Sequence, residues 1–587
     1  MLFRSTANIP DTTLLFEGSV KYTVTGSKEF AVQLSSQGYL YVSHSINDRT
    51  VISLYNGTAL KYSFEFNDQT TNTLYVSVLA NGSVIVKINN GEYVGMGKLE
   101  TSPSMIKFVP LGGNGIIAFT AVELDMYSYK GDVVPEYTSN DKIDFTAYGF
   151  DTSALVSDAG FSQLKEAGFT KVLALYQGRK GYEGNAITEE QAKELMDEVN
   201  ADAETALVLA EEYGIEYYVF NEIIYNLERT TANYGMMEYF KQNATYTLSE
   251  AFAGHFLADE PNWSYNASTG TVSGEIVELV NAYVAYKTAF PDGEAYINLL
   301  PFEGASDSES VGKQRYEAYV RYYIDNIGKE LGYVSYDHYP LNSSGLSTYH
   351  LWNLEIVASL CAEAGVEMRT FVKTASVVDS EYGKVATTCI NDVAMQVYSN
   401  LAFGSKEIGY FTYSSHKDSA SSPAKAIVHG ITGETTELYD WVKTVNNNVQ
   451  ALAPAYLNFK WQSASYVKGT NQYVGTQVQA DKLDNAISVG SYGTLKSVSS
   501  VYNALIGNFT DADGRYSCGA RDGYMLVNYC DTARYGTSGT ANFVLMFSGT
   551  SRALVYQDGA SQVIDFTDGT LTLSLEPGMG AFIIPLV

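Results

Sequence analysis

The distribution of hydrophobic and polar positions divides the chain into three parts. In the first part, up to about residue 130, short runs of alternating polarity such as 74–79 and 83–88 are separated by turns rich in Gly and Asn. The turn Asn81-Gly82 joins these two runs and is typical of a β-hairpin, because both residues accept positive φ angles. No stretch of this part has a helical period. The pattern therefore predicts a β-sandwich domain over residues 1–132.

The period changes in the second part, residues 143–450. Short apolar segments alternate with longer stretches of helical period, which is typical of βα units around a parallel sheet. The predicted strands are 144–150, 171–176, 216–221, 254–258, 294–300, 332–336, 367–373 and 407–413, and the predicted helices include 189–200, 202–213, 276–290, 316–327, 351–364 and 390–402. Eight such units in about 300 residues fit a (β/α)8 barrel. An open doubly wound sheet is the alternative, but no Gly-x-Gly-x-x-Gly motif follows a strand here.

The third part, residues 453–587, is again rich in β-strands. We predict strands at 524–529, 541–547, 553–556 and 571–575, which indicate a second β-sandwich. The polar stretch 130–142 contains Pro135 and is typical of a linker, which would precede the barrel. The expected fold class is thus a central (β/α)8 TIM barrel with an N-terminal and a C-terminal β-sandwich domain.

Composition narrows the possible partners. The 587 residues include 37 basic and 66 acidic side chains, a formal net charge of -29, which repels phosphate backbones and anionic membranes. We expect no nucleic acid partner, and since no run of 18 apolar residues occurs we expect no membrane span. The 47 tyrosines suit sugar binding, because aromatic faces stack on sugar rings, but tyrosine is also a good strand residue. Without a C-x-x-C pair the sequence indicates no metal or other cofactor, and it leaves the oligomeric state open.

The chemistry of a barrel enzyme lies at the carboxyl ends of its strands. The fourth predicted strand ends in Asp259-Glu260-Pro261. Neighbouring strand residues point to opposite faces, so we expect only one of the two acids to face the barrel axis. A partly desolvated carboxyl beside another acid has a raised pKa and can act as a general acid. A salt bridge or a helix cap by Asp259 is the simpler alternative.

On this motif the chain resembles the large retaining clan of (β/α)8-barrel glycoside hydrolases, which carry an Asn-Glu pair at the end of strand four. The resemblance implies that Glu260 is the acid/base residue, with Asp259 in place of the usual asparagine. The flanking parts are similar to domains found in such enzymes: the first part resembles jelly-roll sugar-binding modules, and 575–584 resembles the closing strands of C-terminal glycosidase sandwiches. The implied activity is hydrolysis of a glycosidic bond in an oligo- or polysaccharide.

The chain departs from that clan at strand seven, where the family has a glutamate nucleophile. The strand ends here in Lys373, without an acid. Strand six offers Asp337 within Tyr336-Asp337-His338-Tyr339, and we take it as the candidate second carboxylate, or else as a substrate-binding residue. A carboxyl separation of roughly 6.5–9.5 Å would indicate an inverting enzyme and roughly 5–5.5 Å a retaining one.

Two alternatives stay open. The barrel could bind glycan without hydrolysing it, or it could resemble chitinase- and hexosaminidase-like enzymes, in which the acetamide of the substrate is the nucleophile. In each case we expect the carbohydrate to be bound by strand-end residues, namely Asp259, Tyr148, Asp151, Tyr176, Arg179, Asn221, Glu222, Asn298, Tyr336, His338, Tyr339, Lys373 and Tyr413. An enzyme of this class is expected to be secreted or displayed on the cell surface. The start Met1-Leu2-Phe3 has no signal-peptide apolar segment, so we expect a trimmed start.

Overall fold

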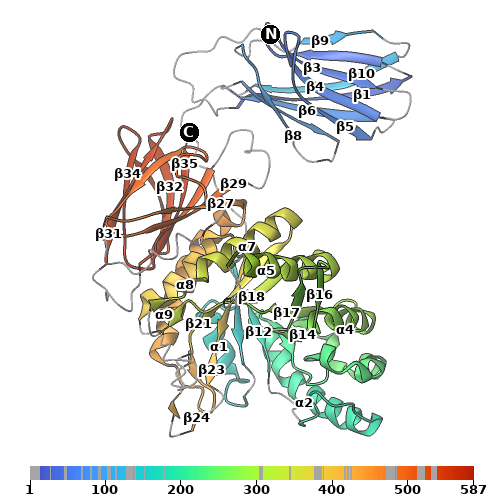
Figure 1. The fold of residues 1–587 in the computed structure, drawn as a ribbon, viewed down its shortest axis with the longest axis vertical. Helices are drawn as coiled ribbons and strands as arrows, with labels where there is room; N and C mark the ends of the chain where they lie inside the picture. The colour runs from blue at the N-terminus through green and yellow to red at the C-terminus, as the bar shows by residue number, and fades with distance from the viewer. Residues whose placement is uncertain are drawn as a thin grey trace.

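The structure, a computed structural model, places a β-sandwich, a barrel and a second β-sandwich in chain order (Figure 1). It describes residues 14–26, 28–44, 49–67, 71–79, 82–89, 91, 94–101, 107–112, 116–126, 137, 141–150, 152–175, 180–302, 304, 309–342, 345–375, 387, 389–415, 418–419, 422–423, 426–470, 483, 486–511, 522–530 and 539–586.

The N-terminal sandwich has two five-stranded antiparallel sheets, ordered β10-β1-β6-β7-β8 and β5-β4-β3-β2-β9. Its core is its own, because the buried side chains Tyr22, Phe30 and Leu74 pack only among residues of this part. The predicted hairpin is confirmed, since β6 and β7 pair across the turn that contains Gly82. The strands are β1 (Leu14–Thr25), β2 (Lys28–Gln33), β3 (Gly38–His44), β4 (Arg49–Asn56), β5 (Ala59–Asn67), β6 (Thr71–Leu79), β7 (Ser83–Ile88), β8 (Val94–Lys98), β9 (Lys107–Pro110) and β10 (Ile116–Met126).

The middle part forms a closed barrel of eight parallel strands, in which the last strand pairs with the first. Each strand lies within two or three residues of its predicted place, because each is a short apolar run that ends at polar or glycine residues. The strands are β11 (Asp144–Tyr148), β12 (Lys171–Leu173), β13 (Glu216–Val219), β14 (Phe252–Asp259), β17 (Glu294–Leu299), β18 (Tyr333–Asp337), β21 (Glu367–Lys373) and β22 (Glu407–Phe411).

The helices cover the outside of the barrel (Figure 1). The two helices predicted over 189–213 are one, because Ala201-Asp202 does not break the period; the helix starts at a capping box of Thr188 with Gln191 and ends at Gly214 with φ 62°. The helices are α1 (Asp158–Glu166), α2 (Glu189–Tyr213), α3 (Met237–Asn243), α4 (Glu275–Ala289), α5 (Glu309–Tyr323), α6 (Lys329–Leu331), α7 (His350–Ala364), α8 (Ile390–Ala402) and α9 (Glu437–Tyr456), with shorter turns η1 (Leu227–Arg229), η2 (Thr231–Met236), η3 (Thr245–Leu248) and η4 (Ile324–Gly328).

Short strands decorate the barrel loops: β15 (Ser264–Asn266) pairs with β16 (Thr271–Ser273), β19 (Leu341–Asn342) with β20 (Gly345–Leu346), β23 (Ser414–Ser415) with β26 (Val428–His429), and β24 (Asp418–Ser419) with β25 (Ser422–Pro423).

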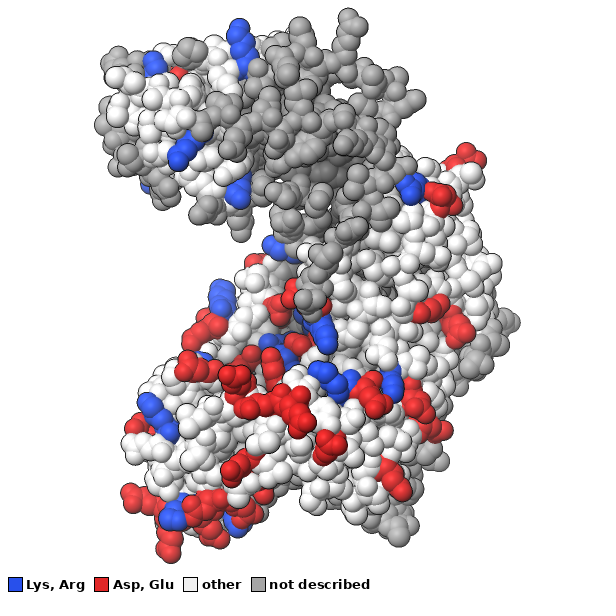
Figure 2. All heavy atoms as spheres, turned by 180° about the vertical axis from the view of Figure 1, so that it is seen from behind, with Lys and Arg blue, Asp and Glu red and all other residues white. Residues whose placement is uncertain are grey.

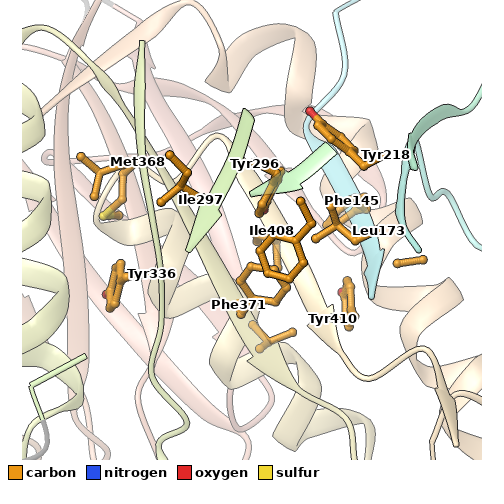
Figure 3. Close-up of a cluster of buried hydrophobic side chains, with 14 of the residues drawn as sticks. Phe145, Leu173, Tyr218, Tyr296, Ile297, Tyr336, Met368, Phe371, Ile408 and Tyr410 are labelled. Carbon is orange, nitrogen blue, oxygen red and sulfur yellow. The ribbon is translucent and has the colours of Figure 1, made fainter. Parts of the chain in front are cut away.

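Aromatic rings fill the barrel interior. Phe371 meets Tyr296 and Tyr148 edge to face, and it fits because Gly409 opposite has no Cβ, which would lie 2.3 Å from the Phe371 ring. Figure 3 shows Tyr296 and Phe371 within this buried cluster. Since the rings close the interior, a substrate can reach the barrel only at its rim.

The amino-terminal end of the barrel is closed by a buried ion network. Glu407 accepts from Lys171 at 3.0 Å and from the Tyr296 hydroxyl at 3.0 Å, and it lies 3.3 Å from Arg369. Burial alone would raise the pKa of Glu407, but Arg369 and Lys171 outweigh it and lower that pKa to about 2. This end of a barrel serves stability, so chemistry is expected at the opposite end, the mouth formed by the carboxyl ends of the strands.

The C-terminal sandwich stacks a six-stranded sheet, β27-β29-β30-β35-β32-β33, on a three-stranded one, β28-β31-β34. One face of the larger sheet joins the barrel core, where Phe509 and Phe582 pack on Tyr456 at the end of α9. The strands are β27 (Phe459–Val467), β28 (Leu495–Ser499), β29 (Ala504–Asp511), β30 (Asp522–Asn528), β31 (Ala541–Phe547), β32 (Arg552–Gln557), β33 (Ala560–Asp565), β34 (Thr570–Leu575) and β35 (Gly580–Leu586). The predicted fold class, a TIM barrel between two β-sandwiches, is confirmed.

Candidate active site at the barrel mouth

A β-bulge turns Asp259 into the mouth. Along β14 and β17, Phe256 pairs with Tyr296 and Ala258 with Ile297, so Leu257 is an extra residue. Without this bulge Ala258 would pair with Asn298, but with the bulge Asp259 pairs with Asn298. Bulges commonly re-aim a side chain beside an active site.

The next residue, Glu260, adopts an unusual backbone conformation with φ 50°. A non-glycine residue pays for a left-handed conformation in free energy, and such residues persist where the surrounding structure holds them. Here the Glu260 N–H donates to the Asn298 carbonyl at 2.8 Å. The bulge and this turn together bring both acids to the mouth, so the expectation that only one of them faces the barrel axis is wrong.

Three carboxyls meet around the amide of Asn298. Its Nδ2 donates to Asp259 Oδ1 at 3.2 Å and to Asp337 Oδ1 at 3.1 Å, and its Oδ1 accepts from the Ser335 hydroxyl at 3.0 Å. Asp337 is also hydrogen-bonded to the side chains of Glu260 and Tyr339. The amide thus holds two carboxyls in place while the third shares a hydrogen bond with one of them.

Burial and like charge raise the pKa values of two of these carboxyls, Asp259 and Asp337. Burial, followed by the charge of Asp337, raises the pKa of Asp259 to about 7. Burial and then the charge of Glu260 raise the pKa of Asp337 well above its usual value. Two carboxyls that share a hydrogen bond cannot readily ionise together, so near neutral pH the Glu260–Asp337 pair retains a proton.

Aromatic side chains and one cation surround the carboxyls. The Tyr148 hydroxyl lies 3.5 Å from Asp259 Oδ2, and its ring meets Phe411 edge to face. Tyr339 also packs on Phe411, and the Lys373 ammonium lies 5.5 Å from the Tyr339 ring. Burial lowers the pKa of Lys373. A polar centre with an aromatic rim is the usual make-up of a small-molecule site.

The loop after Glu260 is firmly anchored. The Tyr319 hydroxyl donates to the Pro261 carbonyl at 3.1 Å, and the Trp263 ring stacks on Tyr319 at 4.8 Å. Glu275, at the start of α4, accepts from the Asn262 N–H at 3.0 Å. A side chain that must transfer a proton at a fixed point benefits from such a rigid support.

Several predicted binding residues serve the scaffold instead. Asn221 caps its own loop by accepting from the N–H groups of Ile223 and Ile224. Glu222 accepts from three backbone N–H groups, at residues 180–182, and so fixes the loop after strand two. These two side chains are already engaged, and neither reaches the three carboxyls.

Three more of the predicted residues point away from the mouth. Tyr336 groups with Ile297 and Met368 in Figure 3, since it alternates with Asp337 along β18. Tyr413 is fully buried against Phe150 and Phe169. His338 stacks on His350 and contacts the Ser347 hydroxyl, and burial lowers its pKa to about 4, so it is neutral at pH 7. Asp151, Tyr176 and Arg179 lie outside the described residues.

The structure adds one acid that the sequence did not single out, Glu228 in η1. Its side chain is fully buried, and its only described partner is Arg229, whose Nε lies 3.6 Å from Oε1. Burial, opposed in part by its own backbone N–H and by Arg229, raises the pKa of Glu228 to about 7, and Asp259 is among the charges that act on it. The residue lies nine positions beyond β13 in a segment without periodicity, so no pattern marks it.

Within the described residues, no three His, Cys, Asp or Glu side chains are grouped so that they could hold a metal ion. The same residues include no helix that is long and apolar enough to cross a membrane. Figure 2 shows Asp and Glu side chains spread over the barrel half of the face opposite to Figure 1. An acidic surface of this kind disfavours anionic partners.

No protein-family model and no curated protein matches the sequence. Solved structures similar to this one include a family 39 glycoside hydrolase from the gut symbiont Bacteroides cellulosilyticus WH2 (TM-score 0.39, 10% identity, 100% of this chain and 96% of that chain). Another is a GH30 endoxylanase from Clostridium papyrosolvens C71 (TM-score 0.37, 10% identity, 76% of this chain and 97% of that chain). A third is a putative α-L-fucosidase from Bacteroides thetaiotaomicron VPI-5482 (TM-score 0.36, 13% identity, 55% of this chain and 99% of that chain). All three carry the names of glycosidases. Identities this low carry no activity over to this chain.

Proposed function

We propose that this protein is a glycoside hydrolase that acts on an oligo- or polysaccharide, with Glu260 as the general acid. The observation that carries the proposal is the pairing of Glu260 with Asp337 at the barrel mouth, where Asn298 holds Asp337 and where burial and the charge of Glu260 raise the pKa of Asp337. A glycosidic oxygen leaves only if it receives a proton as its bond to the anomeric carbon breaks, and a carboxyl of raised pKa can supply that proton near neutral pH.

The pair suits proton delivery better than nucleophilic attack. Side chains in direct contact, as Glu260 and Asp337 are, stand closer together than the roughly 5–5.5 Å between the carboxyls of a retaining pair or the roughly 6.5–9.5 Å of an inverting pair. Asp337 is therefore placed to hold the proton of Glu260. It is a weaker candidate for the nucleophile than the sequence alone indicated.

This geometry favours a second candidate of the same class, substrate-assisted hydrolysis. The acetamide oxygen of an N-acetylated sugar would form a bond to the anomeric carbon while the leaving oxygen takes the proton of Glu260. Asp259, fixed by Asn298 and facing Tyr148, could accept the acetamide N–H. Water would then open the cyclic intermediate and return a proton to Glu260, so that no second enzyme carboxylate is required as nucleophile.

A substrate panel tests the proposal. Aryl glycosides of neutral sugars and of N-acetylhexosamines, together with glycan polymers, are incubated with the wild type, Glu260→Gln and Asp337→Asn. We expect wild-type turnover of at least one substrate and a loss of roughly 10²–10⁴-fold in Glu260→Gln. Turnover restricted to N-acetylated substrates would favour the substrate-assisted route. Glycan binding without release of sugar by the wild type would leave a non-catalytic binding barrel and overturn the proposal.

A further inference from the structure

A lysine faces the barrel axis at the mouth, Lys373 at the carboxyl end of β21. Alternation along this strand directs Arg369, Phe371 and Lys373 to the same side. Arg369 belongs to the ion network at the amino-terminal end, and Phe371 lies in the ring cluster inside the barrel (Figure 3). Lys373 therefore stands one layer above these rings, at the rim that a substrate can reach, and it is only partly buried.

Tyr339 connects this lysine to the carboxyls. Its side chain is hydrogen-bonded to Asp337, and its ring lies 5.5 Å from the Lys373 ammonium. Asp337 in turn is paired with Glu260. The ammonium and Asp337 thus lie beside one and the same tyrosine side chain, a spacing that the ring and the exocyclic group of one sugar unit can bridge.

Lys373 lacks the partner that other buried lysines of the barrel have. Lys171 lies 2.9 Å from Asp144 and 3.0 Å from Glu407, and Lys406 donates to two backbone carbonyls. Among the residues that the structure describes, no carboxylate forms an ion pair with the Lys373 ammonium, and no acid offsets the burial that lowers the pKa of this residue. A cation that loses water without gaining a partner costs free energy, and an anionic group on a ligand would supply the missing partner.

The negative charge of the protein does not oppose such a contact. The acidic surface acts through solvent, where salt screens charges that are more than about 8–10 Å apart. An anion in direct contact with a partly buried ammonium is screened much less. Within the mouth, Asp259 and Asp337 have raised pKa values, which reduces their negative charge near neutral pH.

We propose that Lys373 selects a glycan that carries an anionic group, a carboxylate or a sulfate ester, on the sugar unit bound at the mouth. The ammonium would pair with that group while the Glu260–Asp337 pair faces the glycosidic oxygen. This inference deepens the function proposed above and rests on it for the role of the mouth. Lys373 determines specificity: it binds the ligand and takes no part in breaking a bond.

Calorimetric titration of the full-length Glu260→Gln protein tests this selection without turnover. The probes are oligogalacturonate, oligomannuronate and κ-carrageenan oligosaccharides, each paired with its carboxyl-reduced or desulfated form. We expect at least one acidic probe to bind roughly 10–100-fold more tightly than its neutral form, as a hydrogen bond to a charged group predicts. A preference lost on carboxyl reduction identifies a uronate, and one lost on desulfation identifies a sulfate ester.

Two substitutions of Lys373 in the same protein assign the preference to its charge. Lys373→Met should bring the acidic and neutral forms to similar affinity, whereas Lys373→Arg should keep a preference for the acidic form. Lys373→Met should unfold at no lower temperature than its parent, because it removes a partly buried charge without a partner. The matched control Lys241→Met, at an exposed position of α3, should leave the affinity ratio unchanged.

Equal binding of the acidic and neutral forms of every probe, or a preference that Lys373→Met does not reduce, would overturn this inference. Its failure is separable from that of the proposed function. Hydrolysis of neutral glycans by the wild type, without any preference for an acidic probe, would overturn only the role of Lys373. Selective binding of an acidic probe through Lys373, with no glycan hydrolysed by the wild type, would overturn only the hydrolase activity.

Discussion

Replacing Glu228 by Gln removes a buried carboxyl whose charge the fold does not neutralise well. The pKa of Glu228 is about 7 in the folded protein, against 4.5 for an ordinary glutamate. The two pKa values differ by about 2.5, and each pKa unit corresponds to 1.36 kcal/mol. Ionisation of Glu228 therefore lowers the free energy of unfolding by about 3 kcal/mol. Because the folded pKa is the higher one, the stabilisation is complete below pH 4.5 and is lost as the pH rises to about 7.

Urea unfolding at pH 5 and at pH 8 measures this effect. Tryptophan fluorescence is a suitable signal, since Trp263, Trp352 and Trp441 lie in the barrel. Between pH 5 and pH 8 the free energy of unfolding of the wild type should fall by about 2–3 kcal/mol more than that of Glu228→Gln. The contribution of Asp259 to the pH dependence should cancel in this comparison, because both proteins contain Asp259. Glu212→Gln, at an exposed position of α2, is the control and should behave as the wild type. Equal pH responses of the wild type and Glu228→Gln would refute the reasoning.

Three further predictions follow from the barrel contacts. Glu407→Gln should lower the free energy of unfolding by about 3–5 kcal/mol in urea titrations, because it leaves Lys171 and Arg369 buried without their shared carboxylate. Asn298→Ala should reduce kcat more than it raises KM, since it frees Asp337 without altering the rim. The wild-type kcat/KM should fall at alkaline pH as the Glu260–Asp337 pair loses its proton, and Asp337→Asn should shift that fall; an unchanged profile would contradict the shared proton.

The course of the chain was predictable from the sequence because buried parallel strands are short apolar runs with polar or glycine ends. The bounds of β14 and β21 show this: their apolar residues mark each strand, and Asp259 and Lys373 mark its carboxyl end. The barrel rule then placed Glu260, Asp259, Asn298 and Asp337 at one rim, and the structure brings these four together.

The local geometry of the site could not be predicted in the same way. Strict alternation along β14 directs Ala258 inward, and only the bulge at Leu257 reverses this for Asp259. Nothing in the sequence signals the positive φ of Glu260, because a glutamate rarely adopts it. Alternation does hold at Tyr336, whose side chain lies on the outer face of β18 next to Asp337. Tyr336 was predicted to bind carbohydrate because it stands at the end of a strand, and that reason takes no account of the face to which it points.

The position of Glu228 illustrates a second limit. A buried acid in an irregular loop becomes visible only when the loop is folded over β14, where the Asn226 N–H donates to the Leu257 carbonyl at 2.8 Å. Glu222, in contrast, stands directly after β13, but three backbone N–H groups occupy it. Position directly after a strand singled out Glu222, which the scaffold occupies, and missed Glu228, whose pKa the fold raises to about 7.

The most direct test of Glu260 as the general acid compares two glycosides of one sugar, one with an alkyl leaving group and one with a dinitrophenyl leaving group. The second leaves without protonation, so it does not need the acid. In Glu260→Gln we expect hydrolysis of the alkyl glycoside to fall by roughly 10²–10⁴-fold and hydrolysis of the dinitrophenyl glycoside to fall far less. Equal losses on both substrates, or no loss on either, would contradict the role assigned to Glu260.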